Sequence, residues 1–313
     1  MPDHYVSQYI CLFNLDGYMI TYASRTVLLI IGFSLTSAMA TAQKVKEPKT
    51  TAEWVTAYQP FCIAGNLYYV GTYDLACFLI TTPQGHILIN TGLAASASQI
   101  RHNIETLGFK FTDIKILLTT QAHYDHLGAM HAIKKSTGAK FMVDEKEADV
   151  VATGGSSDYA LGKYGTSFEP LKVDRLLHDN DTIKFGGMQL VMLHHPGHTK
   201  GSCSFLFTVK DDQRSYRVLI ANMPTIVTDK AFADISAYPA IATDYAYTLN
   251  AMKSISFDIW LASHAGQFNL HSKHKPGDPY NPTAFFDQQG YDNELSDLQK
   301  QYEEKQQQKP AGN

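Results

Sequence analysis

The chain has 313 residues, of which 44% are hydrophobic and 18% are charged, and its formal net charge is −4. That composition is typical of a globular protein with enough apolar material for a large core. The sequence contains no basic stripe, which argues against nucleic acid as a partner.

The N-terminal segment has the pattern of a secretory signal peptide. Arg25 precedes an apolar run at 26–35, and small residues suited to cleavage follow at 38–42. The run is too short to cross a bilayer. We therefore expect residues 1–42 to be a cleaved leader and translation to begin at Met19. The mature protein is then expected in the periplasm, without stable membrane association.

Four cysteines are present, and one of them, Cys11, would be lost with the leader. The remaining Cys62, Cys77 and Cys203 match no metal-binding or redox spacing. They are expected to stay free, with a Cys62–Cys77 bridge as the alternative in an oxidising compartment.

Apolar and β-branched stretches alternate with helical patterns along residues 43–313, which we predict to be one domain. In the first half, strands are expected at 61–70, 75–81, 85–90, 116–120 and 140–143, and helices at 54–58, 100–107, after 126 and at 145–153. In the second half, strands are expected at 182–185, 188–193, 202–208, 216–220 and 258–262, and helices at 243–254 and from 284 onward. This order predicts an α/β fold of two sheets with helices outside. A long aperiodic loop at 154–170 is typical of a lid or binding loop.

Three of the predicted strands end in turns that carry metal-binding residue types. Such strand ends are where open α/β sheets place their chemistry. The six candidate ligands in these turns are Gln121, His123, Asp125, His126, His198 and His264.

These side chains divide into two predicted metal sites. The first consists of Gln121, His123 and His198, and the second of Asp125, His126 and His264. Neutral imidazoles with one carboxylate and an open position suit Zn²⁺, so we expect one or two zinc ions per chain. The Gln121 amide oxygen is a poorer donor than imidazole, so the first site is expected to bind zinc more weakly. The neighbouring His194 and His195 are expected to support the site.

The spacing of these residues resembles the metallo-β-lactamase superfamily. His-x-Asp-His stands at 123–126, Pro-Gly-His-Thr-x-Gly at 196–201 and Ser-His at 263–264. Gln121 in place of the usual first histidine, together with the stretch 64–74, is similar to subclass B3 enzymes of the GOB type. The resemblance implies an αββα sandwich of two mixed sheets flanked by helices.

The resemblance also implies an activity, namely hydrolysis of the β-lactam amide by zinc-bound hydroxide, which confers resistance to penicillins, cephalosporins and carbapenems. Asp125 would orient the water, while Thr225 and Tyr159 are candidate substrate contacts that could equally serve loop structure and packing. The enzyme is expected to be a monomer.

One strand end separates this chain from its relatives. Glyoxalase II and lactonase relatives place a bridging aspartate after the strand at 216–220, and subclass B1 and B2 lactamases place a cysteine there. This chain has Ala221, Asn222 and Met223 instead, which favours a B3 lactamase. The alternatives are another hydrolase of this fold, such as a lactonase or thioesterase, and an exported zinc-binding protein without catalysis.

Overall fold

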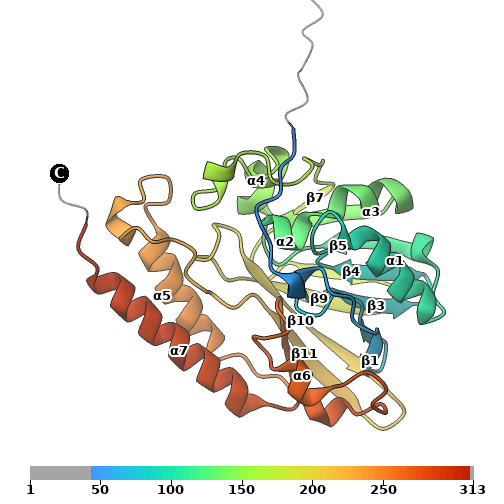
Figure 1. Ribbon diagram of the computed structural model, residues 1–313. Helices are drawn as coiled ribbons and strands as arrows, with labels where there is room; N and C mark the ends of the chain where they lie inside the picture. Colours follow the sequence, from blue (N-terminus) through green and yellow to red (C-terminus); the bar gives the residue numbers. More distant parts are fainter. Residues whose placement is uncertain (1–43, 311–313) are drawn as a thin grey trace, which may run out of the picture. The chain divides into compact units, whose positions relative to one another are not determined.

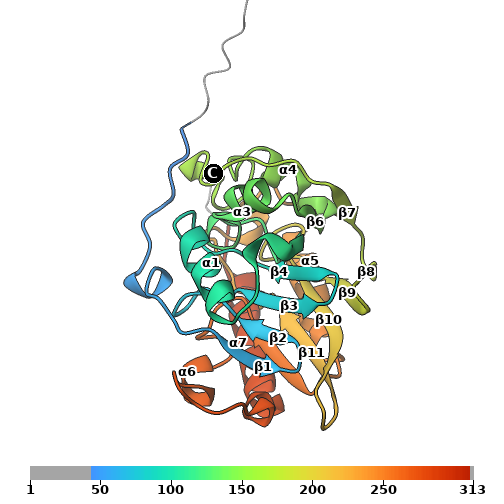
Figure 2. The ribbon, with the colours of Figure 1, turned by 90° about the vertical axis from the view of Figure 1, so that its right-hand side faces the viewer.

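Two β-sheets lie face to face in the computed structural model, which describes residues 44–310. Helices cover the outer faces of both sheets, as Figure 1 and the perpendicular view in Figure 2 show. The predicted arrangement of two sheets with helices outside is thereby confirmed. The predicted leader lies outside the described residues.

The first sheet contains seven strands within the described range, in the order β1 to β7. They are β1 (Phe61–Ala64), β2 (Leu67–Tyr69), β3 (Phe78–Thr82), β4 (Gly85–Ile89), β5 (Ile114–Leu118), β6 (Lys140–Asp144) and β7 (Arg175–Leu177). Strands β1 to β4 pair antiparallel, whereas β4 to β7 pair parallel. The carboxyl ends of β4 and β5 therefore lie at the same edge of the sheet.

The second sheet has five strands among residues 44–310, in the order β12-β11-β10-β9-β8. They are β8 (Thr182–Phe185), β9 (Met188–His194), β10 (Cys203–Lys210), β11 (Ser215–Ala221) and β12 (Ile259–Ala262). Only β11 and β12, of these described strands, pair parallel. Both sheets are mixed, as the sequence resemblance implied.

Alternating side chains build two apolar layers, because successive strand residues point to opposite faces. On β3, Phe78 and Ile80 belong to the large core that includes the second sheet, whereas Leu79 belongs to the core beneath the outer helices. The helices on the first sheet are α1 (Ser96–Thr106), α2 (Tyr124–Leu127), α3 (Met130–Thr137) and α4 (Ala148–Ala152). The remaining helices are α5 (Ile241–Met252), α6 (Leu270–Lys273) and α7 (Gln288–Gln307).

The N-terminal part of the first sheet differs from the prediction in two places. The expected single strand at 61–70 is wrong, because Gly65 turns the chain with a positive φ of 55° and β1 pairs back on β2. A Cβ at Gly65 would lie 2.3 Å from the Lys210 carbonyl oxygen, so the turn requires glycine. The helix expected at 54–58 is also wrong, because a single 3₁₀ turn at Ala52–Trp54 replaces it.

Further differences concern short or irregular elements. The edge strand β7 and the one-turn helix α6 were not expected. The C-terminal helix begins at Gln288 rather than near 284, since Asp287 caps it by accepting a hydrogen bond from Gly290 N at 2.8 Å. Cys62, Cys77 and Cys203 are free, as expected, and Cys62 and Cys77 form no bridge. No helix among residues 44–310 has the length and apolarity needed to span a membrane.

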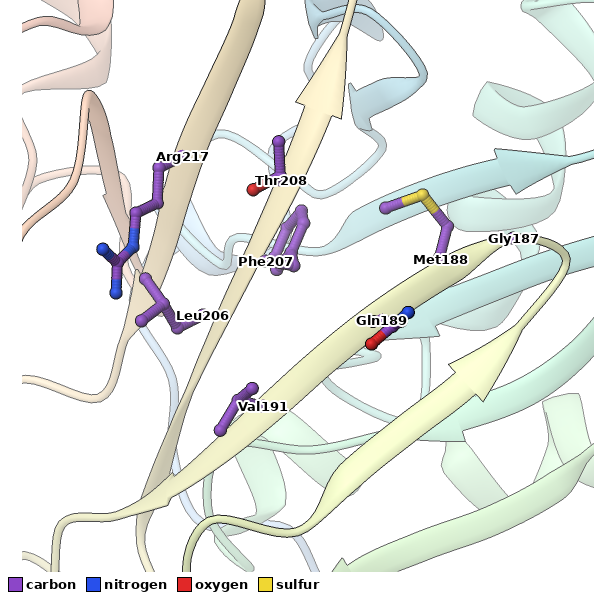
Figure 3. A pocket seen from close by; sticks show the side chains of 8 residues that line it. All are labelled: Gly187, Met188, Gln189, Val191, Leu206, Phe207, Thr208 and Arg217. Carbon is purple, nitrogen blue, oxygen red and sulfur yellow. The ribbon is translucent and has the colours of Figure 1, made fainter.

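A shallow hollow of about 410 Å³ lies on the outer face of the second sheet, across β9, β10 and β11 (Figure 3). Its lining includes Gln189, Val191, Leu206, Thr208 and Arg217. Of these five side chains, only Arg217 carries a charge. The candidate ligands His198 and His264 follow the carboxyl ends of β9 and β12. The hollow, in contrast, is lined by residues within β9, β10 and β11.

Candidate metal centre

The first polar turn is held open by Asn90 at the end of β4. Asn90 adopts a φ of +61°, a left-handed conformation that asparagine tolerates better than most residues. Its Oδ1 accepts hydrogen bonds from Thr120 N at 2.9 Å and from the hydroxyls of Thr119 and Thr120. The carbonyl of His126 accepts from both Thr91 N and Thr91 Oγ1. The end of β4 thus fixes the backbone on both sides of the ligand cluster.

Asp125, His126 and His264 converge at one point. Asp125 Oδ2 lies 3.1 Å from His126 Nε2 and 3.3 Å from His264 Nε2. One donor atom from each residue lies within 4.8 Å of the others, which is the spacing of a shared metal ion. The structure therefore brings together the three residues that we assigned to the second site.

His123 and His198 approach one another beside this cluster. His123 Nδ1 and His198 Nε2 lie 3.2 Å apart, and Gln121, two residues before His123 in the chain, is also buried. His198 Nδ1 donates to the Thr225 carbonyl at 2.7 Å, which turns Nε2 toward His123. Two of the three ligands of the predicted first site thus face each other directly.

The buried polar atoms fit a bound cation. Gln121 Oε1 is buried without a hydrogen-bond partner among the described residues, and His126 Nε2, although 3.1 Å from Asp125 Oδ2, makes no hydrogen bond to it. Buried polar atoms are rarely left in this way, and a metal ion would satisfy both. Burial lowers the pKa of His198 to about 3 and also lowers the pKa of His126, which favours the neutral, metal-binding imidazole, whereas Asp125 and Asp74 raise the pKa of His264 to about 9 against the effect of burial. Burial alone would raise the pKa of Asp125, but His126 and His264 hold it well below its usual range.

Two acidic side chains that the sequence analysis did not single out lie against the outer nitrogens of candidate ligands. Asp74 Oδ2 accepts a hydrogen bond from His264 Nδ1 at 2.9 Å. Asp158 Oδ2 lies 3.6 Å from His123 Nε2, and both side chains are buried. Asp158 is fixed in turn by the backbone N–H groups of Ala160 and Leu161. Carboxylates in this position set the orientation and basicity of a metal-binding histidine.

The turn that carries His198 rests on a second group of buried acids. Glu147 Oε1 accepts hydrogen bonds from Thr199 Oγ1 and from Gly201 N. Asp144 Oδ2 accepts from His194 Nδ1 at 2.7 Å. The expected supporting role of His194 is thus a contact with β6 behind the turn.

The two candidate substrate residues also lie beside this turn. Thr225 presents its carbonyl and its hydroxyl to His198 Nδ1, the hydroxyl at 3.0 Å. Tyr159 donates its hydroxyl to the carbonyls of Gly197 and His198, at 3.2 and 3.0 Å. Its ring packs on Tyr238 with centroids 5.1 Å apart. Tyr159 therefore contacts the protein through both its ring and its hydroxyl.

Comparison with known proteins agrees with this geometry. The model of the metallo-beta-lactamase superfamily matches residues 72–211. The class B3 di-zinc metallo-β-lactamase LRA-12 from an Alaskan soil metagenome is 70% identical with a TM-score of 0.82, covering 83% of this chain and 99% of that one. The metallo-β-lactamase GOB-18 from Elizabethkingia meningoseptica is 60% identical with a TM-score of 0.84, covering 84% and 98%. This chain belongs to the class B3 metallo-β-lactamases.

A curated relative of this B3 enzyme matches over a shorter stretch. A probable metallo-hydrolase of Burkholderia pseudomallei is 30% identical over 117 residues, and the chain spans 37% of that protein's length. The solved B3 enzymes, in contrast, match along almost their entire chains.

The end of β11 in this B3 enzyme supplies no further ligand. Met223 is 2% exposed and packs in the large core. Asn222 N donates to Ser204 Oγ at 3.1 Å, and that hydroxyl also lies 2.7 Å from His195 Nδ1. Neither an aspartate nor a cysteine is present at this strand end, so His264 remains the candidate third ligand beside Asp125 and His126.

Proposed function

We propose that this B3 enzyme hydrolyses the amide bond of β-lactam antibiotics with Zn²⁺ held by Gln121, His123 and His198 and by Asp125, His126 and His264. The observation that carries the proposal is the approach of His126 Nε2 and His264 Nε2 to Asp125 Oδ2, at 3.1 and 3.3 Å. The identity of 70% to a di-zinc class B3 enzyme supports the same assignment.

Different residues have different proposed roles in hydrolysis. Zinc at this position would polarise the lactam carbonyl and lower the pKa of water toward neutrality. Asp125 orients the attacking water toward the carbonyl carbon. The new C–O bond forms there, the C–N bond breaks, and the nitrogen takes up the proton that the water releases. Thr225, at the rim beside His198, is the proposed contact for the substrate carboxylate.

Supporting groups keep the ligands in place through the reaction. Asp74 accepts a hydrogen bond from the outer nitrogen of His264 at 2.9 Å, and the Asp158 carboxylate lies 3.6 Å from the outer nitrogen of His123. Fixed ligands need little rearrangement when charge develops in the transition state, and this lowers the barrier. Tyr159 supports the His198 turn from behind.

Export and substrate range form part of the proposal. The signal-peptide pattern at residues 1–42 supports a periplasmic enzyme that meets antibiotics as they enter the cell, and we propose that it acts as a monomer. Penicillins, cephalosporins and carbapenems are the proposed substrates.

Hydrolysis of nitrocefin and of a carbapenem by the purified enzyme tests the proposal. We expect turnover that a chelator abolishes and that added Zn²⁺ restores, with little turnover of a lactone or a thioester. Preferred turnover of the lactone or thioester would instead support the other hydrolases of this fold. Zinc uptake without turnover of any of these compounds would support a binding protein.

A further inference from the structure

Trp54 lies at the metal centre although it belongs to the exposed N-terminal segment. Each residue of the stretch 51–57 is exposed except Trp54, which is half-buried. Its indole Nε1–H donates to Asp74 Oδ2 at 3.0 Å. That oxygen is the one that accepts from His264 Nδ1 at 2.9 Å. One carboxylate oxygen thus joins the N-terminal segment to a ligand of the second metal site.

The Asp74 carboxylate has a donor on each of its oxygens. Oδ2 accepts from Trp54 and His264, and Oδ1 accepts from Gly266 N at 3.1 Å. Three donors from separate parts of the chain leave this carboxylate one orientation that satisfies them all. Trp54 therefore restricts the rotation of the group that aims His264.

The indole ring also covers the ligand. The ring centroids of Trp54 and His264 lie 5.5 Å apart, and those of Trp54 and Tyr124 lie 6.2 Å apart. The His264 and Asp74 side chains are only 21% and 18% exposed. Excluding water strengthens a hydrogen bond between a carboxylate and an imidazole.

Hydrogen bonds on both sides of Trp54 tie the segment to the body of the enzyme. Thr56 O accepts from Tyr73 N at 2.8 Å, directly beside Asp74. Further up the chain, Glu47 Oε1 accepts from Ala94 N at 2.7 Å. Trp54 is the member of this segment that reaches the metal centre through a side-chain hydrogen bond.

We propose that Trp54 is a positioning residue of the second metal site, and that its bond to Asp74 couples the order of residues 51–57 to zinc affinity. The inference rests on the proposed zinc site and is independent of the substrate. Because coupling between two binding events is reciprocal, zinc must stabilise the segment by as much as the segment stabilises zinc.

Zinc affinity measured by competition with a chromophoric chelator tests the proposal. We expect Trp54→Ala to weaken the second site about tenfold, the lower end of the range for groups that support metal ligands. Trp54→Phe, which keeps a ring but loses the N–H, should fall between this variant and the unsubstituted enzyme. Asp74→Asn should weaken the site at least as much as Trp54→Ala. Each variant is also measured in a His198→Ala background, which lacks the first site. The zinc-binding step that remains in this background belongs to the second site.

Val55→Ala is the matched control, because Val55 is 57% exposed in the same turn. It should leave zinc affinity unchanged. Hydrogen exchange at residues 51–57 should slow when zinc is added to the unsubstituted enzyme and should slow less in Trp54→Phe. Thermal unfolding in excess chelator checks that every variant is folded.

Two results would overturn the inference. One is a second-site affinity of Trp54→Ala within about twofold of the unsubstituted enzyme, far below the change expected for a group that supports a ligand. The other is hydrogen exchange at residues 51–57 that does not respond to zinc. If the unsubstituted enzyme bound no zinc at all, the proposed function itself would fail, so the two failures are distinguishable.

Discussion

Thr120 and Ser263 share a hydrogen bond between their hydroxyls, with the oxygens 2.9 Å apart. Thr120 follows β5 in the first sheet, and Ser263 follows β12 in the second. Each immediately precedes a proposed ligand, Gln121 in one case and His264 in the other. The two sheets are thus joined at the point where they deliver ligands to the metal centre.

Ser263→Ala is expected to lower the free energy of unfolding by about 0.5–1.5 kcal/mol, because it removes one of the two hydrogen bonds of the buried Thr120 hydroxyl, which keeps Asn90 Oδ1 as its other partner. The double change Thr120→Val with Ser263→Ala should cost less than the sum of the two single changes, since both remove the same bond. Urea unfolding of the three variants measures this coupling. Strictly additive losses would show that the hydroxyls stabilise the fold independently.

Asp158→Asn is expected to weaken the first metal site by about 10–100-fold, because the amide cannot supply the negative charge that orients His123. The second site should keep its affinity, since Asp158 faces only the first. Chelator competition measures both steps. The control is Asp149→Asn, an exposed aspartate of α4, and an equal effect of the two changes would refute a specific role for Asp158.

The candidate metal ligands could be found from sequence because they follow strands whose apolar runs are recognisable. Gln121 and His264 come within three residues of the ends of β5 and β12. The supporting acids could not be predicted, because their partners are set by the tertiary fold. Asp74, for example, is a single acid in a turn and meets His264 from 190 positions away.

Some strands of the fold could likewise be predicted from sequence, and others could not. The apolar strands β4 and β5 stand out because both faces are covered. The edge strand β7 was missed because its three residues, Arg-Leu-Leu, are too few to show a strand period. The hairpin of β1 and β2 was missed because its two-residue turn interrupts a continuous apolar run only at Gly65 and Asn66.

Gln121→His is expected to raise zinc occupancy of the first site, because imidazole is a better zinc donor than an amide oxygen. After dialysis against limiting zinc, the metal content per chain should rise, and turnover under the same conditions should change with it. The control is Gln189→His, which places an imidazole on the exposed outer face of the second sheet. If Gln121→His leaves both metal content and turnover unchanged, the idea of a weak first site is wrong.

Glu147 is expected to make stability fall as the pH rises from about 4.5 to 7. Burial raises the pKa of this carboxyl from 4.5 to about 7, against the opposing effects of the Thr199 hydroxyl and His123. Between these values the folded chain holds a proton that the unfolded chain has released. Raising the pH therefore favours unfolding across this window, by at most about 3 kcal/mol for a shift of this size.

Glu147→Gln removes this titration but keeps an oxygen that can accept from Thr199 and Gly201. Urea unfolding in excess chelator should give a variant that gains stability relative to the unsubstituted enzyme between pH 5 and pH 8. Glu145→Gln, at an exposed position in the same turn, should leave the pH dependence as it is. Parallel stability curves for Glu147→Gln and the unsubstituted enzyme would mean that Glu147 is already ionised in the fold. The buried charge would then be stabilised by the Thr199 and Gly201 contacts to Oε1 and by His123.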